Sequence, residues 1–459
     1  MRYVAFCLLA LLFAPHASAQ KDSLPKGIGA YTFGYRYFDK QTHKYDEDGQ
    51  LQALGAPFSK EFSGQNLLDG AGGEQLKKLA NELKKFDGNS TSDDSLLNTL
   101  NLGTLNIDVQ AEITGQAIGL GYGFLNNFSG FLVVPWAEVS VDADITFGGD
   151  NNAAEIKSRL GDLAFDELKS GLDTAQNVNA QQIIDGITDL GYEDPRHWEH
   201  QGLGDVQFGT IFSGSNRVTR RNSTVQTLKT TVTVPTGYYE DPDILTDVSL
   251  SKGYYLLTNT YSQKLVFGRL FYIGADGTIG LGAPNTVSKR VPEENESLVN
   301  PDRTESVTLT PGADIGYGGF AGLKLGMFKS RYYLGAKSHL KDSYSGSIEG
   351  NYDKLSNGSD SYQLYHEPSV ALDTTDAFKN GRFLLPLIAQ IKAHLPIKAK
   401  NSLNDKSYEL TLTSFFSTPY ASTTKTTSKK PKKSKTKRKR HFTNKKKRKS
   451  KSKKTRNVH

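Results

Sequence analysis

The sequence predicts an all-β fold: an antiparallel transmembrane β-barrel of about 12 strands (12–14) with helical extracellular loops and a disordered C-terminal tail. Apolar and polar side chains alternate with period two in segments long enough to cross a bilayer as tilted strands. Tyr and Phe recur on the apolar side of these segments, as in the lipid-facing band of a barrel. No run of roughly 18 apolar residues follows the N-terminal region, so no helical membrane span is expected.

The first 19 residues have the features of a secretory signal peptide. Arg2 precedes an apolar run from Tyr3 to Ala14, and Ala17-Ser18-Ala19 has the small-x-small pattern of a cleavage site. The run is shorter than the roughly 20 residues of a spanning helix, which argues against an uncleaved anchor. We therefore expect export, with Gln20 as the mature N-terminus. Cys7, the only cysteine, lies inside the peptide, so the mature protein is expected to have no disulfide.

Residues 119–136, GLGYGFLNNFSGFLVVPW, predict a long β-hairpin. Ile118, Leu120, Tyr122 and Phe124 alternate with glycines, and a polar turn at 126–129 follows. Beyond the turn, the alternate positions from Val133 to Ile145 are apolar and oppose Glu138, Ser140, Asp142 and Asp144. The apolar positions from Leu105 to Ile113 have the opposite parity to Ile118, which suggests a β-bulge near Gly115.

The same alternation recurs along the chain, as in Tyr31, Phe33, Tyr35 and Tyr37 and again between Tyr408 and Phe416. The even strand count suits a closed bacterial barrel with both chain ends in the periplasm. The candidate strands lie near 30–38, 105–125, 130–145, 203–213, 224–237, 252–262, 264–275, 306–319, 331–345, 359–371, 383–398 and 407–416.

Turn lengths predict the orientation of the barrel, residues 20–420. The connections at 126–129 and 220–223 are short, whereas those near 39–104, 146–202 and 280–305 are long and are expected outside the cell. The first long loop has apolar residues at helical spacing, namely Leu76, Leu79, Ala80, Leu83 and Phe86, and so does the second, with Ile156, Leu160, Leu163, Ala164 and Leu168 followed by QQIIDGITDL. These helices are expected either to form a lid over the lumen or to pack on each other.

Six polar residues are expected to face the lumen. A barrel of about twelve strands lies between filled small barrels and open porins, so these groups either pair and plug the lumen or select a solute. The candidates are Arg36, Asp205, Lys337, His339, Lys392 and His394.

Three motifs resemble enzymatic or cofactor sites but lack a residue or a context that such a site requires. LSNGSD, residues 355–360, resembles a barrel phospholipase motif, but Lys354 stands where the base His is required, so an external turn is expected. HWEH lacks the spacing of a zinc site, so His197 and His200 are expected in an external loop with Trp198 at the membrane interface. The glycine-rich stretch 274–284 is expected to be a turn. We predict no catalytic residue, metal or cofactor.

Residues 421–459 carry 19 Lys or Arg and no Asp or Glu, and removing them changes the formal net charge from +7 to −12. Such a segment is expected to be disordered. Because Phe416 ends the last strand, the tail should emerge into the periplasm, where it could bind peptidoglycan or anionic headgroups. A solvated appendage and an altered reading frame are the alternatives. The signal peptide argues against nucleic acid as a partner, and Phe442 is the only aromatic available for stacking.

YGFLNNFSGFLVVPW, GLGDVQFGT, VTVPTGYY, LTPGADIGYGG and PLIAQIKAHLPIKAKN with YELTLTSFF resemble the long-chain fatty-acid transporter superfamily, and within it the outer-membrane proteins encoded with phenol meta-cleavage pathways. The resemblance covers roughly residues 28–416 and implies structural roles for Gly204-Asp205 and Pro235-Thr236-Gly237. It departs from the best-known members because only QKDSLPKGIG precedes the first strand, too few residues for a folded hatch.

The resemblance implies a monomeric barrel in the lipid of the bacterial outer membrane that takes up hydrophobic small molecules, either aromatic compounds or fatty acids. A structural surface barrel anchored to the cell wall by its tail and a non-specific diffusion channel are the alternatives. An unrecognised barrel enzyme is a third reading, which a Ser-His or metal cluster at the rim would favour.

Overall fold

The computed structural model describes residues 23–68, 73–87, 95–161, 165–268, 270–293 and 298–417. The signal peptide and the basic tail that the sequence predicts lie outside the described residues. None of the helices in the described part of the chain is both long and apolar enough to span a membrane.

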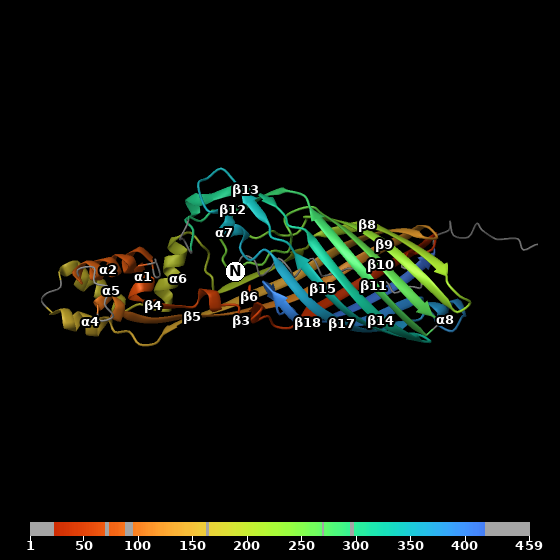
Figure 1. Cartoon of the computed structure of the whole chain (residues 1–459), viewed down its shortest axis with the longest axis horizontal. Helices are drawn as coiled ribbons and strands as arrows, with labels where there is room; N and C mark the ends of the chain where they lie inside the picture. The colour runs from red at the N-terminus through yellow and green to blue at the C-terminus, as the bar shows by residue number, and fades with distance from the viewer. Residues whose placement is uncertain are drawn as a thin grey trace, which may run out of the picture. The chain divides into compact units, whose positions relative to one another are not determined.

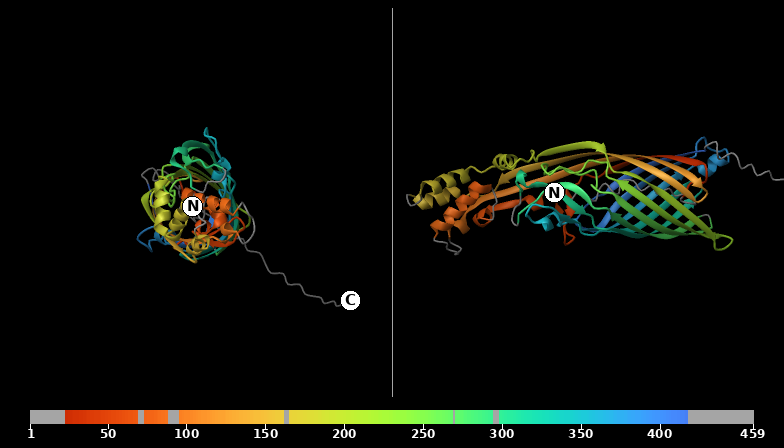
Figure 2. Two further views of the ribbon diagram at one scale, coloured as in Figure 1. Left: turned by 90° about the vertical axis from the view of Figure 1, so that its left-hand side faces the viewer. Right: turned by 90° about the horizontal axis from the view of Figure 1, so that it is seen from above.

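Twelve antiparallel strands of the described chain form a closed barrel (Figures 1 and 2). The first strand, β1, pairs with the last strand, β20, on one side and with β5 on the other, and the pairing of β5 with β6 closes the ring. The predicted all-β antiparallel barrel of about 12 strands is therefore confirmed. The barrel strands are β1 (Ile28–Phe38), β5 (Asn101–Leu125), β6 (Phe128–Gly148), β8 (Val206–Arg217), β9 (Asn222–Val234), β10 (Leu256–Phe267), β11 (Phe271–Gly282), β14 (Asp314–Leu325), β15 (Phe328–His339), β17 (Ser361–Asp373), β18 (Leu387–Lys400) and β20 (Ser407–Ser417).

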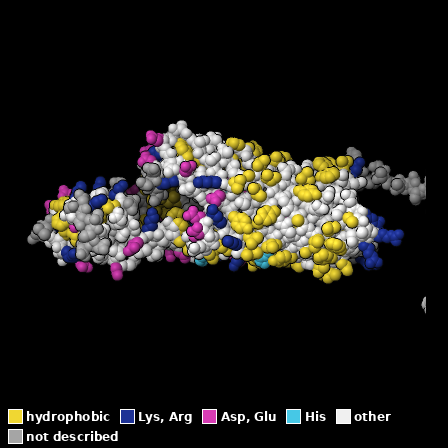
Figure 3. All heavy atoms as spheres, viewed as in Figure 1, with side chains coloured by type: hydrophobic (Ala, Val, Ile, Leu, Met, Phe, Trp, Pro, Cys, Tyr) yellow, Lys and Arg dark blue, Asp and Glu magenta, His cyan; other side chains and the backbone are white. Residues whose placement is uncertain are grey.

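Exposed apolar side chains are spread over the outside of the barrel, and Figure 3 shows them on one face. In β1, Tyr31, Tyr35 and Tyr37 are exposed, whereas Arg36 between them is buried. Tyr408 of β20 pairs with Tyr37 and is also exposed. This alternation places aromatic and aliphatic groups toward lipid and polar groups toward the lumen, as the sequence predicts.

Short turns connect the strands at one end of the barrel, which we call the short-turn end. It holds the turns at 126–127, 218–221, 268–270 and 326–327, together with the first and last barrel residues, Ile28 and Ser417, which pair with each other. The opposite end, the long-loop end, carries two small three-stranded sheets. One consists of β2 (His43–Tyr45), β3 (Leu51–Ala53) and β19 (Ser402–Leu403), and the other of β12 (Asn285–Arg290), β13 (Thr304–Thr310) and β16 (Ser343–Ser345).

Strands β5 and β6 continue well beyond the lipid-facing band at the long-loop end (Figure 1). The outward face of β5 is polar at Glu112 and Gln116 and apolar at Ile118 and Leu120, so it passes from water to lipid between residues 116 and 118. The fifteen residues before Gln116 extend the hairpin by roughly 50 Å at the usual rise of a strand.

The apolar positions of β5 switch from one face of the strand to the other without a β-bulge, so the bulge predicted near Gly115 is wrong. The ladder between β5 and β6 is regular from Thr104 to Gly123, and its register shifts only between Gly123 and Leu125. Outside the membrane, the inward side chains such as Val109 and Ile113 form the core, and the outward face is polar. The apolar face of a regular strand therefore switches from the outside to the inside where the strand leaves lipid.

Three further strand predictions are wrong, and one of them is the single strand expected at 331–345, which is β15 and the separate strand β16. The turn between β10 and β11 lies at 268–270, so the boundary expected near residue 263 is displaced, and most of the glycine-rich stretch 274–284 belongs to β11. Gly274 makes room for a neighbouring ring, because a Cβ there would lie 2.4 Å from Phe320 Cζ. The single strand expected at 306–319 is two elements, β13 and the start of β14.

Both long loops contain the expected helices. Leu79 and Leu83 of α2 share one apolar cluster with Ile156 of α4, Leu168 of α5 and Leu102 of β5. These helices therefore pack on each other and on the far end of the β5–β6 hairpin, which is the second of the two expected arrangements (Figure 1). Leu163 and Ala164 lie outside the described residues. The helices are α1 (Gly64–Leu68), α2 (Gly73–Phe86), α3 (Leu96–Thr99), α4 (Ala153–Leu160), α5 (Asp166–Gln176) and α6 (Ala180–Asp189), with α7 (Tyr352–Ser356) and α8 (Thr375–Lys379) in later loops.

Trp198 does not lie at the membrane interface, which corrects a second prediction. HWEH begins β7 (His197–Leu203), which pairs with the extended part of β6, and Trp198 is 8% exposed within the core beneath the loops. Trp136 of β6 is instead 45% exposed, next to the apolar band. An indole that carries one polar group suits that boundary.

Candidate functional site

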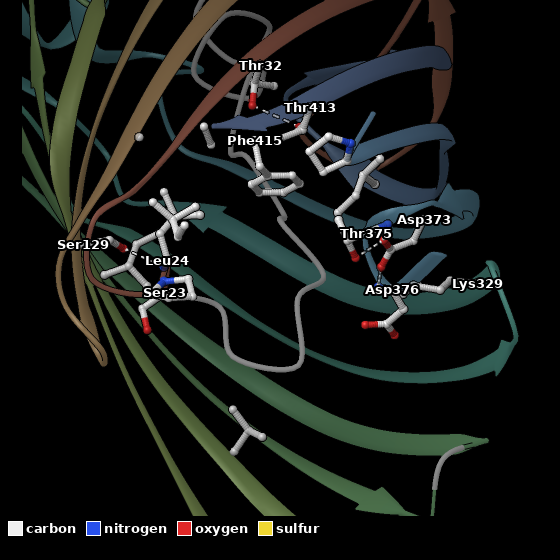
Figure 4. Close-up of a pocket in the computed structure, with 18 of the residues that line it drawn as sticks. Ser23, Leu24, Thr32, Ser129, Lys329, Asp373, Thr375, Asp376, Thr413 and Phe415 are labelled. Carbon is white, nitrogen blue, oxygen red and sulfur yellow. Dashed lines mark hydrogen bonds and ion pairs between the residues drawn. The ribbon is translucent and has the colours of Figure 1, made fainter. Parts of the chain in front are cut away.

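A cavity of 1340 Å³ occupies the lumen toward the short-turn end, and we call it the short-turn cavity (Figure 4). Its wall includes the lumenal side chains of β1, β5, β6, β8, β18 and β20, and the loop of residues 374–386 borders its mouth. Ile28, Phe131, Val225, Ile388 and Phe415 supply apolar surface. A concave and largely apolar chamber with a few polar groups is the usual setting of a small-molecule site.

The chain segment before β1 lies against the inner wall of this cavity. Leu24 N is 3.4 Å from Ser129 Oγ, and the Gly27 N–H donates to the Gly123 carbonyl. The glycines of β5 allow this approach, because a Cβ on Gly123 would lie 2.1 Å from the Pro25 carbonyl oxygen. The bare glycine face that the sequence shows in β5 thus accommodates a second stretch of backbone.

Paired charges line the lumen at the inner end of the cavity, where Glu409 also lines the cavity wall, and we call this group the charged belt. Arg36 is 1% exposed and donates from Nε and Nη2 to Ser407 Oγ, at 3.0 and 2.8 Å. Lys392 Nζ lies 2.8 Å from Glu409 and 3.8 Å from Glu367. Burying such ions is tolerated only when they are paired and hydrogen-bonded. The belt comprises Arg36, Lys337, Glu367, Lys392, His394, Asp405 and Glu409.

His394 is as deeply buried as Arg36 and Asp405 of the belt, with 1% exposure. Its Nδ1 lies 3.0 Å from Glu367 Oε1, and its Nε2 lies 3.2 Å from Gln363 Oε1 and 3.7 Å from Asp405. Asp405, in the loop before β20, also faces Lys337 at 3.9 Å. Although burial opposes its ionisation, the Lys337 ammonium and the hydrogen bonds with His394 and Gln363 hold the pKa of Asp405 at about 2.

His339 belongs to a separate polar cluster at the long-loop end. Its Nδ1 lies 2.7 Å from Asp314 Oδ1, and its Nε2 lies 2.9 Å from Asp342 Oδ1. Asp314 also pairs with Lys252 at 2.8 Å. The cluster ties the loop before β10 to the ends of β14 and β15, so it is suited to holding loops in place.

Asp205 binds backbone groups of a loop. It accepts from the Gly237 and Lys252 N–H groups at 3.2 and 2.8 Å, and burial raises its pKa. Gly204 lies in the same contact, because a Cβ on Gly237 would come within 3.0 Å of Gly204 Cα, and Thr236 Oγ1 donates to the Gly204 carbonyl. The two motifs GLGD and VPTG are distant in the sequence, and they are held in contact by these hydrogen bonds.

Sequence reasoning found the basic members of the charged belt and missed the acidic ones. Glu367, Asp405 and Glu409 complete the pairs, and Glu409 and Glu367 could have been found because they lie on the lumenal parity of their strands. It also missed Lys229 of β9, which faces the lumen opposite the exposed Leu228. Asp405 lies in a loop, where no periodicity signals its position.

The enzyme-like motifs LSNGSD and HWEH make contacts that hold the fold together. Ser356 of LSNGSD is buried at the end of α7, and Ser359 Oγ donates to its carbonyl. His197 pairs with Asp142 at 2.7 Å on the outer face of the hairpin. Among the described residues, no group of three or more His, Cys, Asp or Glu side chains is arranged to hold a metal ion.

No protein-family model and no curated protein matches the chain. Among solved structures, an outer membrane channel from Pseudomonas putida F1 is similar over 86% of this chain and 97% of its own, with 8% identity and a TM-score of 0.47. The CymD monoaromatic hydrocarbon channel is similar over 86% of this chain and 89% of its own, with 7% identity and a TM-score of 0.29. The P. putida toluene transporter TodX is similar over 86% of this chain and 91% of its own, with 8% identity and a TM-score of 0.27.

Proposed function

We propose that the protein is a bacterial outer-membrane channel that takes up hydrophobic small molecules. The short-turn cavity carries this proposal, because its volume of 1340 Å³ and its apolar lining suit a solute that is poorly soluble in water. Transfer of an apolar solute from water into such a chamber lowers its free energy.

The charged belt favours a hydrophobic conduit over a water-filled pore. Arg36, Lys392 and His394 are all held by partners from neighbouring strands, and the segment from Ser23 to Gly27 takes up further lumenal space. Ions crossing the lumen would have to separate these pairs in a region of low polarity, which is unfavourable. A hydrophobic channel is therefore favoured over a diffusion channel.

Uptake by whole cells tests the proposal, because the lipopolysaccharide layer excludes hydrophobic probes from intact cells. The full-length protein is expressed in a bacterial host that lacks its major porins. Two measurements are compared with the empty vector: the fluorescence rise of N-phenylnaphthylamine and the hydrolysis of the hydrophilic substrate nitrocefin by periplasmic β-lactamase. We expect faster uptake of the hydrophobic probe and unchanged nitrocefin hydrolysis. Faster nitrocefin hydrolysis would identify a diffusion channel, and no change in either rate would favour a structural barrel.

We also propose that the basic tail binds anionic cell-wall polymer or headgroups in the periplasm. The observation that favours this role is that β20 ends at Ser417 at the short-turn end, which in barrels of this type faces the periplasm, 4 residues before a segment with 19 cationic side chains. Full-length protein and a variant truncated after residue 420 are sedimented with purified cell wall. Co-sedimentation of the full-length protein alone, weakened by salt, is expected. Equal recovery of both proteins would remove the proposal.

A further inference from the structure

Two neighbouring strands carry amide side chains on the outer wall of the barrel, inside the apolar band. Gln226 of β9 and Gln263 of β10 are both exposed, and they are cross-strand partners. Along the outer face of β10, Leu257 and Tyr261 precede Gln263 and Phe267 follows it, and all three of these apolar or aromatic side chains are exposed. Gln263 therefore lies within the apolar band and not at its edge.

The chain itself does not satisfy these two amides. No hydrogen bond joins the side chain of Gln226 or Gln263 to another group of the described residues. By contrast, Asn259, a second outward-facing amide of β10, accepts from Thr230 Oγ1 at 2.8 Å. Hydrocarbon offers no hydrogen-bonding partner, so an unpaired amide there is unfavourable. The two glutamines therefore need a partner from outside the chain.

Small residues flank the glutamines on both sides of the row. Gly214 of β8 is the cross-strand partner of Gln226, Ala275 of β11 is the partner of Gln263, and Gly319 of β14 follows Ala275. A Cβ on Gly214 would meet nothing within 4 Å, and a Cβ on Gly319 would have its nearest neighbour at 3.7 Å. Packing within the chain therefore requires glycine at neither position, although glycine weakens a strand. These residues keep the outer wall flat, which allows another backbone to approach closely.

A second copy of the same chain can complete this surface. An amide has both a donor and an acceptor, so a glutamine can pair with the same glutamine of a copy related by a two-fold axis. We propose that the outer wall formed by β8, β9, β10 and β11 is a dimer interface, in which Gln226 and Gln263 of two copies hydrogen-bond to each other within the membrane. A lipid tail supplies no such hydrogen bond, whereas a second copy presents matching amides at the same depth. The family resemblance implies a monomer, so the proposal departs from that expectation.

Thiol cross-linking in the membrane tests the proposal. Cys7 is the only cysteine of the chain and lies in the predicted signal peptide, so an introduced cysteine is the only thiol of the exported protein. Ala275→Cys places a thiol beside the glutamines and leaves both of them in place. Leu412→Cys is the matched control, because Leu412 is exposed on the outer wall of β20, six strands from β10 in either direction around the barrel. Outer membranes that contain the full-length variants are treated with a short bis-maleimide, and the fraction of protein at twice the monomer mass is measured.

We expect Ala275→Cys to give a cross-linked dimer and Leu412→Cys to remain monomeric. Addition of Gln226→Leu and Gln263→Leu to Ala275→Cys should lower the dimer fraction by about fivefold or more, since the interfacial hydrogen bonds are lost. Addition of Ser414→Leu, which removes a lipid-facing polar group from β20, should leave that fraction unchanged.

Three results would overturn the proposal: no dimer with Ala275→Cys, equal cross-linking at the two positions, or an unchanged dimer fraction after both glutamines are replaced. Heat-modifiable mobility verifies that each variant is folded. If the variant without the two glutamines does not fold, the comparison of Ala275→Cys with Leu412→Cys decides.

Discussion

Charged side chains inside this barrel occur in pairs whose members come from different strands. Lys392 of β18 lies between Glu367 of β17 and Glu409 of β20, and His394 contacts Glu367 as well. Each ion would be destabilising alone, because burial removes its hydration. Removal of one partner should therefore lower the free energy of unfolding by more than the loss of a single contact.

Asp405 gives a test of this expectation. Its pKa is about 2 in the folded protein against an ordinary value of 3.8, so its ionised form stabilises the fold above about pH 4, and that stabilisation is lost as the pH falls toward 2. Asp405→Asn should lower the free energy of unfolding by about 2 kcal/mol at neutral pH and flatten its fall in acid. Urea unfolding followed by tryptophan fluorescence measures this. The exposed Asp353→Asn should behave as the unaltered protein, and a similar loss in both variants would contradict the account.

At the residue scale, the sequence predicts which side chains face the lumen, but it does not predict which residues they pair with. Arg36 and His394 could be placed on the inner face because their neighbours, such as Tyr35 and Tyr37, alternate with them along a strand. Their partners come from strands with no fixed relation in the sequence, so Ser407 and Asp405 could not be assigned. Pairing depends on register, which a single strand does not reveal.

At the element scale, β5 and β6 serve two environments within one hairpin. Near the short-turn end, their outer faces carry Leu120 and Leu132 toward lipid, whereas farther along their inner faces carry Val109 and Val139 into the core beneath the loops. Because both segments alternate with period two, the sequence predicts the strands correctly. It does not show which face is buried, and this is why a bulge near Gly115 was a reasonable but wrong expectation.

The glycine-rich stretch 274–284 is also ambiguous in the sequence, because its composition suits either a turn or a strand. Residues 274–284 contain the glycines typical of a turn, yet most of them form β11, because small residues there admit the Phe320 ring. Glycines are frequent both in turns and in strands that pack closely against a bulky side chain, so a single sequence does not distinguish the two. The bulky residue that distinguishes them lies on another strand.

The two tryptophans of the chain test the two environments of the hairpin separately. Trp198→Phe leaves only Trp136, which faces outward at the edge of the apolar band, and Trp136→Phe leaves only the buried Trp198. Brominated phospholipid in proteoliposomes should quench most of the fluorescence of Trp198→Phe and little of that of Trp136→Phe. Stronger quenching of Trp198 would contradict the assigned water–lipid boundary.

At the scale of the whole molecule, the structure combines a lipid-facing barrel, a cavity toward the short-turn end and a belt of paired charges at the inner end of that cavity. The β5–β6 hairpin and its helices lie at the opposite end. The general architecture could be predicted because alternation and turn length are local properties of the sequence. The cavity could not be predicted, since its wall is assembled from residues between Ser23 and Ser417.

The central claim is that the lumen is a hydrophobic conduit and not an open aqueous pore. Liposome swelling tests it most directly. Full-length protein is reconstituted, insertion is verified by flotation and by heat-modifiable mobility, and swelling in iso-osmotic arabinose is compared with protein-free liposomes and with a general porin at equal protein content. The account predicts a swelling rate close to that of protein-free liposomes. A porin-like rate would contradict it.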